Sequence, residues 1–134
     1  MSVVEKIANE EGYKPDLYYC TEGYPSIGYG FNIDQVRMPR EVADLWLRMI
    51  IDDLKVEFLK YPWFTKLVYP RQIVILDMAY QMGVSGVLKF KGMIAALSVH
   101  DYEKAAVELM DSKYARQTPN RAKRNRDIIL TAVL

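Results

Sequence analysis

The sequence predicts an α+β fold, with a small N-terminal β-hairpin lobe and a larger, mainly α-helical lobe. Five of the ten tyrosines lie in residues 13–29, among prolines and glycines that favour strands and turns. From Pro39 onward, apolar residues recur at spacings of three and four, which is typical of helices. The 134-residue chain is 51% hydrophobic and 26% charged, so it can bury a core. We therefore expect one domain over 1–134, with a reduced β-lobe at 12–38 and a helical lobe formed by 1–11 and 39–134.

The first expected helix ends in a carboxylate. Val4, Ile7, Ala8 and Glu11 follow the spacing of one helical stripe, and Gly12 is a typical residue to end it. If this stripe faces the core, the Glu11 carboxyl is partly removed from water and holds its proton more tightly, as a general acid must. The alternative is a helix-terminal glutamate that pairs with an arginine.

A β-hairpin is expected next. Residues 17–20 and 26–29 predict two strands, joined by a turn at 21–24 in which Gly23 supplies the positive φ. The hairpin can bring Cys20 and Ser26 near each other and over the end of the first helix. Taken alone, a single cysteine is usually a small buried apolar residue, and Ser26 is a turn residue.

The rest of the chain reads as helices. A long helix over 39–60 ends at Tyr61-Pro62, and a second runs from Pro70 to Gly83. Short helical pieces follow at 85–88 and 92–97. Asp101 is expected to cap a helix through Leu109, and Thr118 to cap the last helix, which opens with Pro119.

Residue counts and charge limit the chemistry. One Cys forbids an internal disulfide, and one Cys with one His argues against a structural zinc site, so we expect no metal and no cofactor. The net charge is +1, but residues 112–126 hold six basic side chains and no acidic one. Such a stretch is suited to binding a polyanion, either nucleic acid or a wall polymer, unless it is only a solvated helix face.

The N-terminus lacks the features of a signal peptide, and no apolar run is long enough to span a membrane.

Three ordered segments resemble one enzyme family. Glu11, eight residues, Cys20, five residues and Ser26 resemble the Glu-x8-Asp/Cys-x5-Thr catalytic signature of phage lysozymes of the T-even endolysin type, glycoside hydrolase family 24. Residues 18–30 are similar to that family's hairpin. Residues 80–87 resemble its Phe-Gln-Met-Gly-x-x-Gly-Val segment, and 103–107 with 117–124 form the third match.

The resemblance implies a lysozyme-like fold and hydrolysis of the β-1,4 bond between N-acetylmuramic acid and N-acetylglucosamine in bacterial peptidoglycan. In the family, the glutamate that matches Glu11 protonates the leaving oxygen. The residue that matches Cys20 is usually Asp and positions or activates water, and the hydroxyl that matches Ser26 helps to hold that water. The arginine that matches Arg121 pairs with the catalytic glutamate. The family's sugar-contact positions match Asn32, Tyr80, Met93 and Glu108, of which Met93 reads equally well as core and Glu108 as surface.

Two departures leave alternatives open. A thiolate at position 20 can act as base or as nucleophile, and Asp16 or Glu22 is the nearest spare carboxylate. The family continues after Gly30 through a strand, a short helix and a loop, whereas here only Phe31 to Met38 precede the long helix.

The leading hypothesis is an active muramidase that acts as a monomer on peptidoglycan, without nucleic acid or membrane insertion. By its resemblance to endolysins, it stays in the host cytoplasm until lysis. The alternatives are a catalytically weakened peptidoglycan-binding homologue and a basic nucleic-acid-binding helical module.

Overall fold

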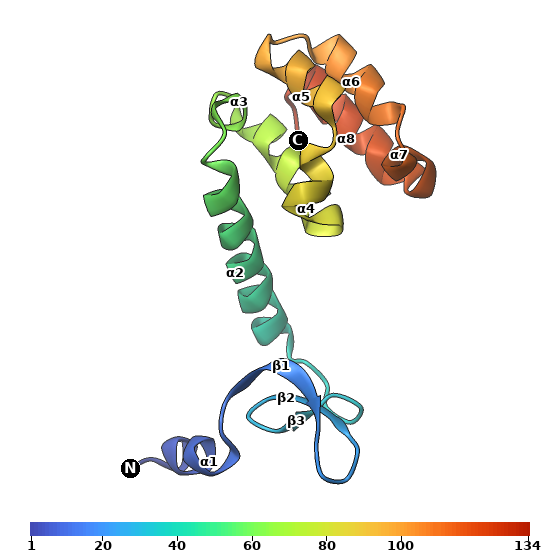
Figure 1. The fold of residues 1–134 in the computed structure, drawn as a ribbon. Coiled ribbons are helices and arrows are strands. Elements are labelled where there is room, and N and C mark those ends of the chain that lie inside the picture. The colour runs from blue at the N-terminus through green and yellow to red at the C-terminus, as the bar shows by residue number, and fades with distance from the viewer. The chain divides into compact units, whose positions relative to one another are not determined.

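The computed structural model describes all 134 residues and divides into two compact units. The N-terminal unit is Met1–Asp44 and the C-terminal unit is Leu45–Leu134. The boundary lies within the long helix α2 (Arg40–Phe58), which is drawn in green in Figure 1. The grouping of residues 1–11 with the helical lobe, and the expected single domain, stay predictions.

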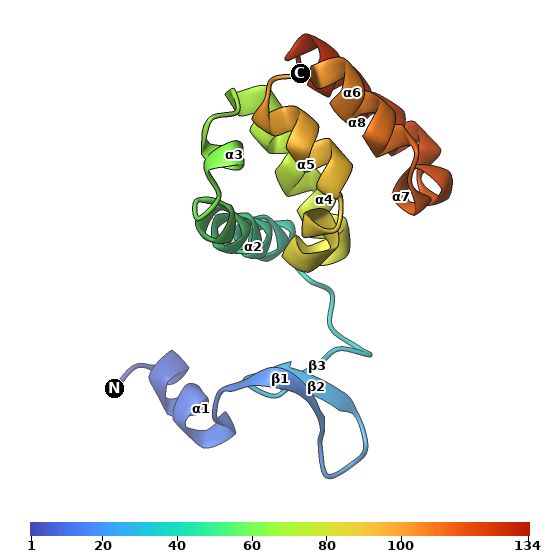
Figure 2. The same ribbon diagram turned by 45° about the horizontal axis from the view of Figure 1, so that its top comes forward.

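The N-terminal unit contains one helix and a three-stranded antiparallel sheet, in the order β1-β2-β3 (Figure 2). The Ser2 hydroxyl and the Glu5 carboxylate form a capping box that begins the helix, and Gly12, at φ 71°, ends it. The sequence predicted the helix and the first two strands. It missed the third strand, which is only two residues long. The elements are α1 (Val3–Glu11), β1 (Lys14–Tyr19), β2 (Pro25–Gly28) and β3 (Phe31–Asn32).

Burial in the N-terminal unit differs from the expectation for α1. No side chain of this helix is buried, and Val4 and Ile7 are 72% and 53% exposed. Glu11 is exposed as well, so the core-facing position expected for it is not found. An apolar stripe indicates which helix face can pack, but burial requires a partner surface, and within this unit only Ser26 is buried.

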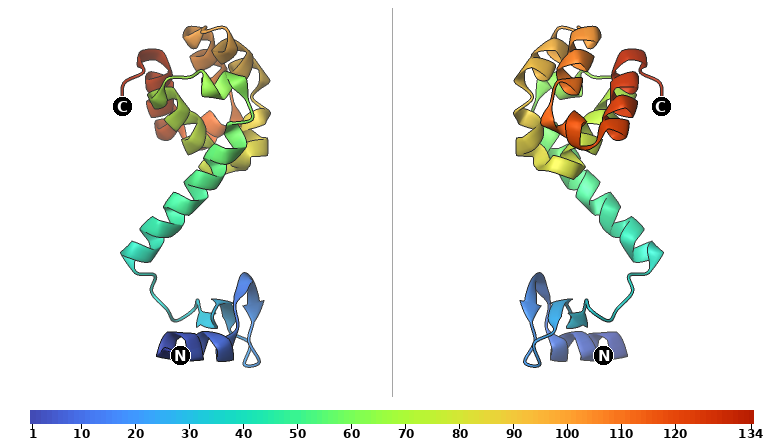
Figure 3. Two further views of the ribbon diagram at one scale, coloured as in Figure 1. Left: turned by 90° about the vertical axis from the view of Figure 1, so that its left-hand side faces the viewer. Right: turned by 90° about the vertical axis from the view of Figure 1, so that its right-hand side faces the viewer.

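The C-terminal unit is a helical bundle, drawn from two further sides in Figure 3. Its buried apolar side chains form one continuous core. The core includes Phe58 at the end of α2, Met78, Met93, Leu109 and Ile129, all at most 1% exposed. Figure 2 shows α6 and α8 side by side. Beyond α2, the elements are α3 (Pro62–Thr65), α4 (Tyr69–Leu88), α5 (Lys91–Ser98), α6 (Tyr102–Met110), α7 (Lys113–Gln117) and α8 (Pro119–Thr131).

Most of the expected helix boundaries are confirmed. Gly83 interrupts α4 with φ 78°, and the Asp101 carboxylate accepts the Lys104 N–H at the start of α6. Thr118 is the N-cap residue of α8, as expected, but its side chain forms no capping hydrogen bond. The Thr118 hydroxyl donates instead to the Tyr114 carbonyl, 3.0 Å away. That contact arises because the short helix α7, which the sequence did not predict, ends next to α8.

No individual helix has the length and apolar character needed to cross a membrane. A bent pair, Tyr69–Leu88 with Lys91–Ser98, passes by length and composition only when its two helices are taken together.

Candidate active site

The sheet of the N-terminal unit places Ser26 between two polar neighbours. Ser26 lies on the central strand β2, where it pairs with Tyr18 on β1 and with Asn32 on β3. Its side chain is 2% exposed, and its hydroxyl donates to the Tyr24 carbonyl at 3.3 Å. Three strands rather than two therefore define the surroundings of this hydroxyl, and they bring Asn32 beside it.

Tyr24 connects Cys20 to Ser26. The Cys20 N–H donates to the same Tyr24 carbonyl that accepts the Ser26 hydroxyl, at 2.9 Å. In return the Tyr24 N–H donates to the Cys20 sulfur at 3.4 Å. The expected approach of Cys20 and Ser26 across the turn is thus confirmed, through one shared peptide. The Cys20 thiol is free and half-buried.

Glu11 extends from the end of α1 toward the turn between β2 and β3. A Cβ atom at Gly30 would lie 2.9 Å from Glu11 Oε2 and 3.8 Å from the Tyr18 hydroxyl oxygen. Gly30 also has φ 73°, a conformation that favours glycine. The absence of a side chain at Gly30 therefore makes room for the carboxylate. No hydrogen bond joins Glu11 to Cys20 or Ser26.

Asn32 has a local structural role besides its place in the sheet. Its side-chain oxygen accepts the Asp34 N–H at 3.0 Å, and its carbonyl accepts the N–H groups of Gln35 and Val36. These contacts form the turn that leads out of β3. The side-chain amide of Asn32 keeps its two N–H donors, which can bind a sugar oxygen.

The predicted sugar-contact residues of the C-terminal unit line two different pockets. A pocket of about 640 Å³ lies among α4, α5, α6 and α7, and Met93, Glu108 and Gln81 are among its lining residues. Met93 belongs to the core, at 0% exposed. A Cβ atom at Gly92 would lie 2.7 Å from Glu108 Oε2, so the carboxylate packs directly over this glycine. Glu108 therefore faces the pocket from close contact with α5.

Tyr80 lies at a second pocket, of about 380 Å³, which is lined by residues of α2, α4 and α8. The tyrosine is 51% exposed, and it shares this pocket with Asp77 and Arg121. The aromatic face expected to stack on a sugar is therefore accessible in the C-terminal unit.

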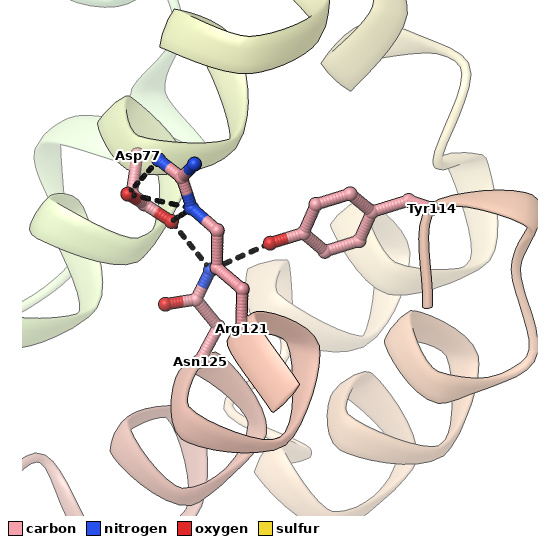
Figure 4. Close-up of polar contacts among 4 residues, drawn as sticks. All are labelled: Asp77, Tyr114, Arg121 and Asn125. Carbon is pink, nitrogen blue, oxygen red and sulfur yellow. Dashed lines mark hydrogen bonds and ion pairs between the residues drawn. The ribbon is translucent and has the colours of Figure 1, made fainter. Parts of the chain in front are cut away.

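Arg121 forms an ion pair that the sequence did not predict. Its Nε and Nη2 donate to the Asp77 carboxylate at 3.0 and 2.5 Å (Figure 4). Asn125 Nδ2 donates two further hydrogen bonds, one to Asp77 Oδ2 at 2.8 Å and one to the Tyr114 hydroxyl oxygen at 2.9 Å. The expected pair of Arg121 with Glu11 would connect the two units and stays a prediction.

The network shifts three pKa values. Partial burial would raise the pKa of Asp77, but hydrogen bonds from Arg121 and Asn125 and the charges of Arg121 and Arg124 together hold it below its ordinary value. The hydrogen bonds that Arg121 donates to the Asp77 carboxylate raise the pKa of Arg121. Burial is the main cause of the raised pKa of Tyr114. Asp77 was available to sequence reasoning, because it is a carboxylate on the apolar stripe of Ile73 and Tyr80.

The described residues contain no group of three or more His, Cys, Asp or Glu side chains placed to hold a metal ion. The N-terminal unit offers a carboxyl, a thiol and a hydroxyl, and the C-terminal unit separately offers the Arg121 guanidinium.

Comparisons with known proteins identify relatives over the whole chain. A probable T4-type lysozyme of Dictyostelium discoideum is 28% identical, over 99% of this chain and 96% of its own length. A second probable T4-type lysozyme of the same organism is 24% identical, with the same coverage. The chain is thus similar to two probable T4-type lysozymes over nearly their whole lengths. The α+β class and the resemblance seen in the sequence are confirmed.

A further relative is part of a larger protein. The pre-baseplate central spike protein Gp5 of Enterobacteria phage T4 is 32% identical over 100% of this chain, but the chain spans only 28% of its length. That alignment extends over 163 positions, so this relative has residues that the 134-residue chain lacks. No protein-family profile matches the chain.

Proposed function

We propose that this protein is a lysozyme that hydrolyses the β-1,4 bond between N-acetylmuramic acid and N-acetylglucosamine in bacterial peptidoglycan. The observation that carries the proposal is the similarity to two probable T4-type lysozymes over nearly their whole lengths. The grouping of a carboxyl, a thiol and a hydroxyl around one small sheet supports it. A bacterial cell wall is the corresponding place of action, and accumulation in the host cytoplasm until lysis remains part of the proposal.

In the proposed reaction, Glu11 is the general acid. Its proton passes to the glycosidic oxygen as the bond to the sugar's anomeric carbon breaks. The position of Glu11 beside Gly30, on an exposed helix end, leaves the carboxyl accessible to a polysaccharide. Arg121 orients Glu11 in this proposal, and Asn32, Tyr80 and Glu108 contact the sugars. The sugar contact expected of Met93 is not proposed, because its side chain is fully buried in the core.

Cys20 and Ser26 handle the second half of the reaction. Either the thiolate removes a proton from the attacking water, with Ser26 holding that water, or the thiolate attacks the anomeric carbon and water later releases the sugar. The first route inverts the anomeric centre and the second retains it. The shared contact of both residues with Tyr24 supports their acting at one place.

A turbidity assay on a peptidoglycan suspension tests the proposal. Wild type should clear the suspension, and Glu11→Gln should lose at least about 100-fold in rate, because Gln keeps the shape but cannot donate the proton. Full activity of Glu11→Gln would refute the proposal. The Cys20→Ser and Cys20→Asp variants test which role the Cys20 thiol has in the reaction. Loss in Cys20→Ser with recovery in Cys20→Asp indicates a base, whereas full activity of Cys20→Ser removes Cys20 from the chemistry.

A second candidate function is binding of peptidoglycan without cleavage. The short segment from Phe31 to Met38, where the resembling family has a further strand, helix and loop, favours it, since fewer residues remain there to hold a polysaccharide in position for cleavage. Sedimentation of the protein with peptidoglycan, without release of reducing ends, would establish this function in place of the first.

A further inference from the structure

Two oxygen-bearing side chains of the N-terminal unit approach the same glycine. A Cβ atom at Gly30 would lie 2.9 Å from Glu11 Oε2 and 3.8 Å from the Tyr18 hydroxyl oxygen. Glu11 ends α1, whereas Tyr18 lies on β1, so two different elements bring a carboxylate and a phenol to one side of Gly30. A rotation of the exposed Glu11 side chain, or one water molecule, is enough to join such a pair by hydrogen bonding.

The sheet fixes the direction of Tyr18. Tyr18 pairs with Ser26 on the central strand, and residues directly opposite each other point to the same face of a sheet. In β1 it is the one residue that is not exposed. Its ring is further covered by Lys14, whose Nζ lies 4.1 Å from the ring centroid. The hydroxyl is therefore held in place, while the exposed Glu11 carboxyl is free to turn toward it.

We propose that Tyr18 is a positioning residue, whose hydroxyl donates a hydrogen bond to the Glu11 carboxylate that forms when the general acid gives up its proton. This inference rests on the proposed function. The proton of Glu11 passes to the glycosidic oxygen as the bond from that oxygen to the anomeric carbon breaks, and the Tyr18 hydroxyl keeps its own proton. A hydrogen bond to the charged form of a carboxyl stabilises that form, so it favours this step.

Lys14 strengthens the donor in this arrangement. A cation over the face of an aromatic ring is attracted to the ring's π electrons, and the polarised ring makes its hydroxyl a better donor. Lys14 pairs with Gly28 across the sheet, so no side chain opposes it on β2. The positive charge also lies on the side of the sheet where the carboxylate forms, which favours the same charged state.

Other titratable groups adjoin Glu11 and Tyr18 along α1, β1 and the turn at Gly30. They are Lys6, Glu10, Tyr13, Asp16, Tyr19, Cys20 and Tyr29. Lys6 and Glu10 form an ion pair with each other, and the rings of Tyr13 and Tyr29 are in contact. The variants below leave all of these charges as they are, so a change in pH dependence reports on Tyr18 and Lys14.

The pH dependence of lysis tests the role, because the alkaline limb of the rate profile reports the proton of the general acid. Tyr18→Phe removes the hydroxyl and keeps the ring. It should lower kcat about 10-fold with KM nearly unchanged, and move the midpoint of this limb to higher pH by about 0.5–1 unit, since the carboxylate loses a donor. Lys14→Met should move the midpoint in the same direction by less, and Lys14→Arg should restore it.

Tyr19→Phe is the matched control. It removes the same hydroxyl from the next residue of β1, which points to the other face of the sheet and is 69% exposed. Its kcat and its midpoint should equal those of wild type. A merely structural role for Tyr18 would lower the melting temperature and the rate without moving the midpoint, and an unmoved midpoint in Tyr18→Phe would overturn the proposal.

NMR titration of the full chain provides a readout that does not depend on lysis. In wild type, the signal of Tyr18 Cζ should change over the same pH range as that of the Glu11 carboxyl carbon, and a constant Tyr18 signal overturns the proposal even if Tyr18→Phe does not fold. Glu11→Gln is assayed alongside. If Glu11→Gln is fully active, the proposed function fails, and the positioning role fails with it. If Glu11→Gln is inactive while the Tyr18→Phe midpoint is unmoved, only the positioning role fails.

Discussion

The two units of this protein differ in how many of their apolar side chains are buried. The C-terminal unit buries a continuous set of apolar side chains from all of its helices. The N-terminal unit buries one residue, Ser26, and leaves Val4, Ile7 and Leu17 more than half exposed. The residues proposed to carry the bond-breaking chemistry all lie in the N-terminal unit. Chemistry and apolar core are therefore separated along the chain, and stability measurements should distinguish the two regions.

The largest contrast is expected between isolated fragments. Residues 45–134 should fold and melt cooperatively alone, since their core is complete within that range. Residues 1–44 should not, because a segment this short with no buried apolar side chain cannot offset the loss of chain entropy. Circular dichroism melts of both fragments provide the measurement. A cooperative melt of fragment 1–44 would show that the comparison is wrong.

Truncation of single apolar side chains should show the same contrast. Leu109→Ala, at a fully buried position, should lower the free energy of unfolding by about 2–5 kcal/mol, because it removes packed atoms and leaves a cavity. Leu17→Ala, at a 53% exposed position, should change it by no more than about 0.5 kcal/mol. Urea unfolding of the full chain measures both. Equal losses would mean that Leu17 is packed in solution.

Two glycine substitutions test whether the Glu11 carboxylate needs the space beside Gly30. Gly30 and Gly23 both have positive φ, but only at Gly30 would a Cβ meet the Glu11 carboxylate, at 2.9 Å. Gly30→Ala should therefore reduce lytic rate by about 10- to 100-fold through displacement of Glu11. Gly23→Ala has the same backbone strain with nothing within 4 Å, and it should keep most of the activity. The comparison fails if the two variants lose activity equally.

The smallest effect concerns acid stability of the C-terminal unit. Because the pKa of Asp77 is lowered on folding, its charged form adds stability above the pKa of an unfolded carboxyl. That stability is lost as the pH falls below about 4 and through the lowered folded value. Asp77→Asn should flatten this part of the dependence of urea midpoint on pH, while Asp127→Asn should not. The pair is about one-third exposed, so the change is modest. If the urea midpoint of Asp77→Asn depends on pH as in wild type, other residues cause the acid sensitivity.

The sequence predicted the secondary structure well where the signals are local. Gly12, Gly83 and Asp101 end or begin helices as expected, because glycine at positive φ and a side-chain cap act within a few residues. Strand β3 and the short helices α3 and α7 were missed, since each is too short to show a period. Thr118 is the N-cap residue of α8 as expected, but its hydroxyl donates to the Tyr114 carbonyl of the unpredicted α7 and does not cap the helix.

In the candidate site too, the sequence predicted the local contacts but not the contacts between residues that are distant in the sequence. The approach of Cys20 and Ser26 followed from a hairpin with a short turn, which is a local property. The partner of Arg121 did not follow, because Asp77 lies 44 residues away in the sequence. The central place of Ser26, with Asn32 at its side, likewise depended on a strand that the sequence did not reveal.

The sequence by itself determined the class of fold, the order of the elements and the residue types that suit glycoside hydrolysis, since periodicity, turn residues and motif spacing are written along the chain. Only the tertiary structure decided which stripes are buried, that Glu11 lies exposed beside Gly30, and that Arg121 is held by Asp77, Asn125 and Tyr114. The physical reason is that burial and side-chain pairing are properties of two surfaces in contact, whereas a sequence pattern describes one surface at a time.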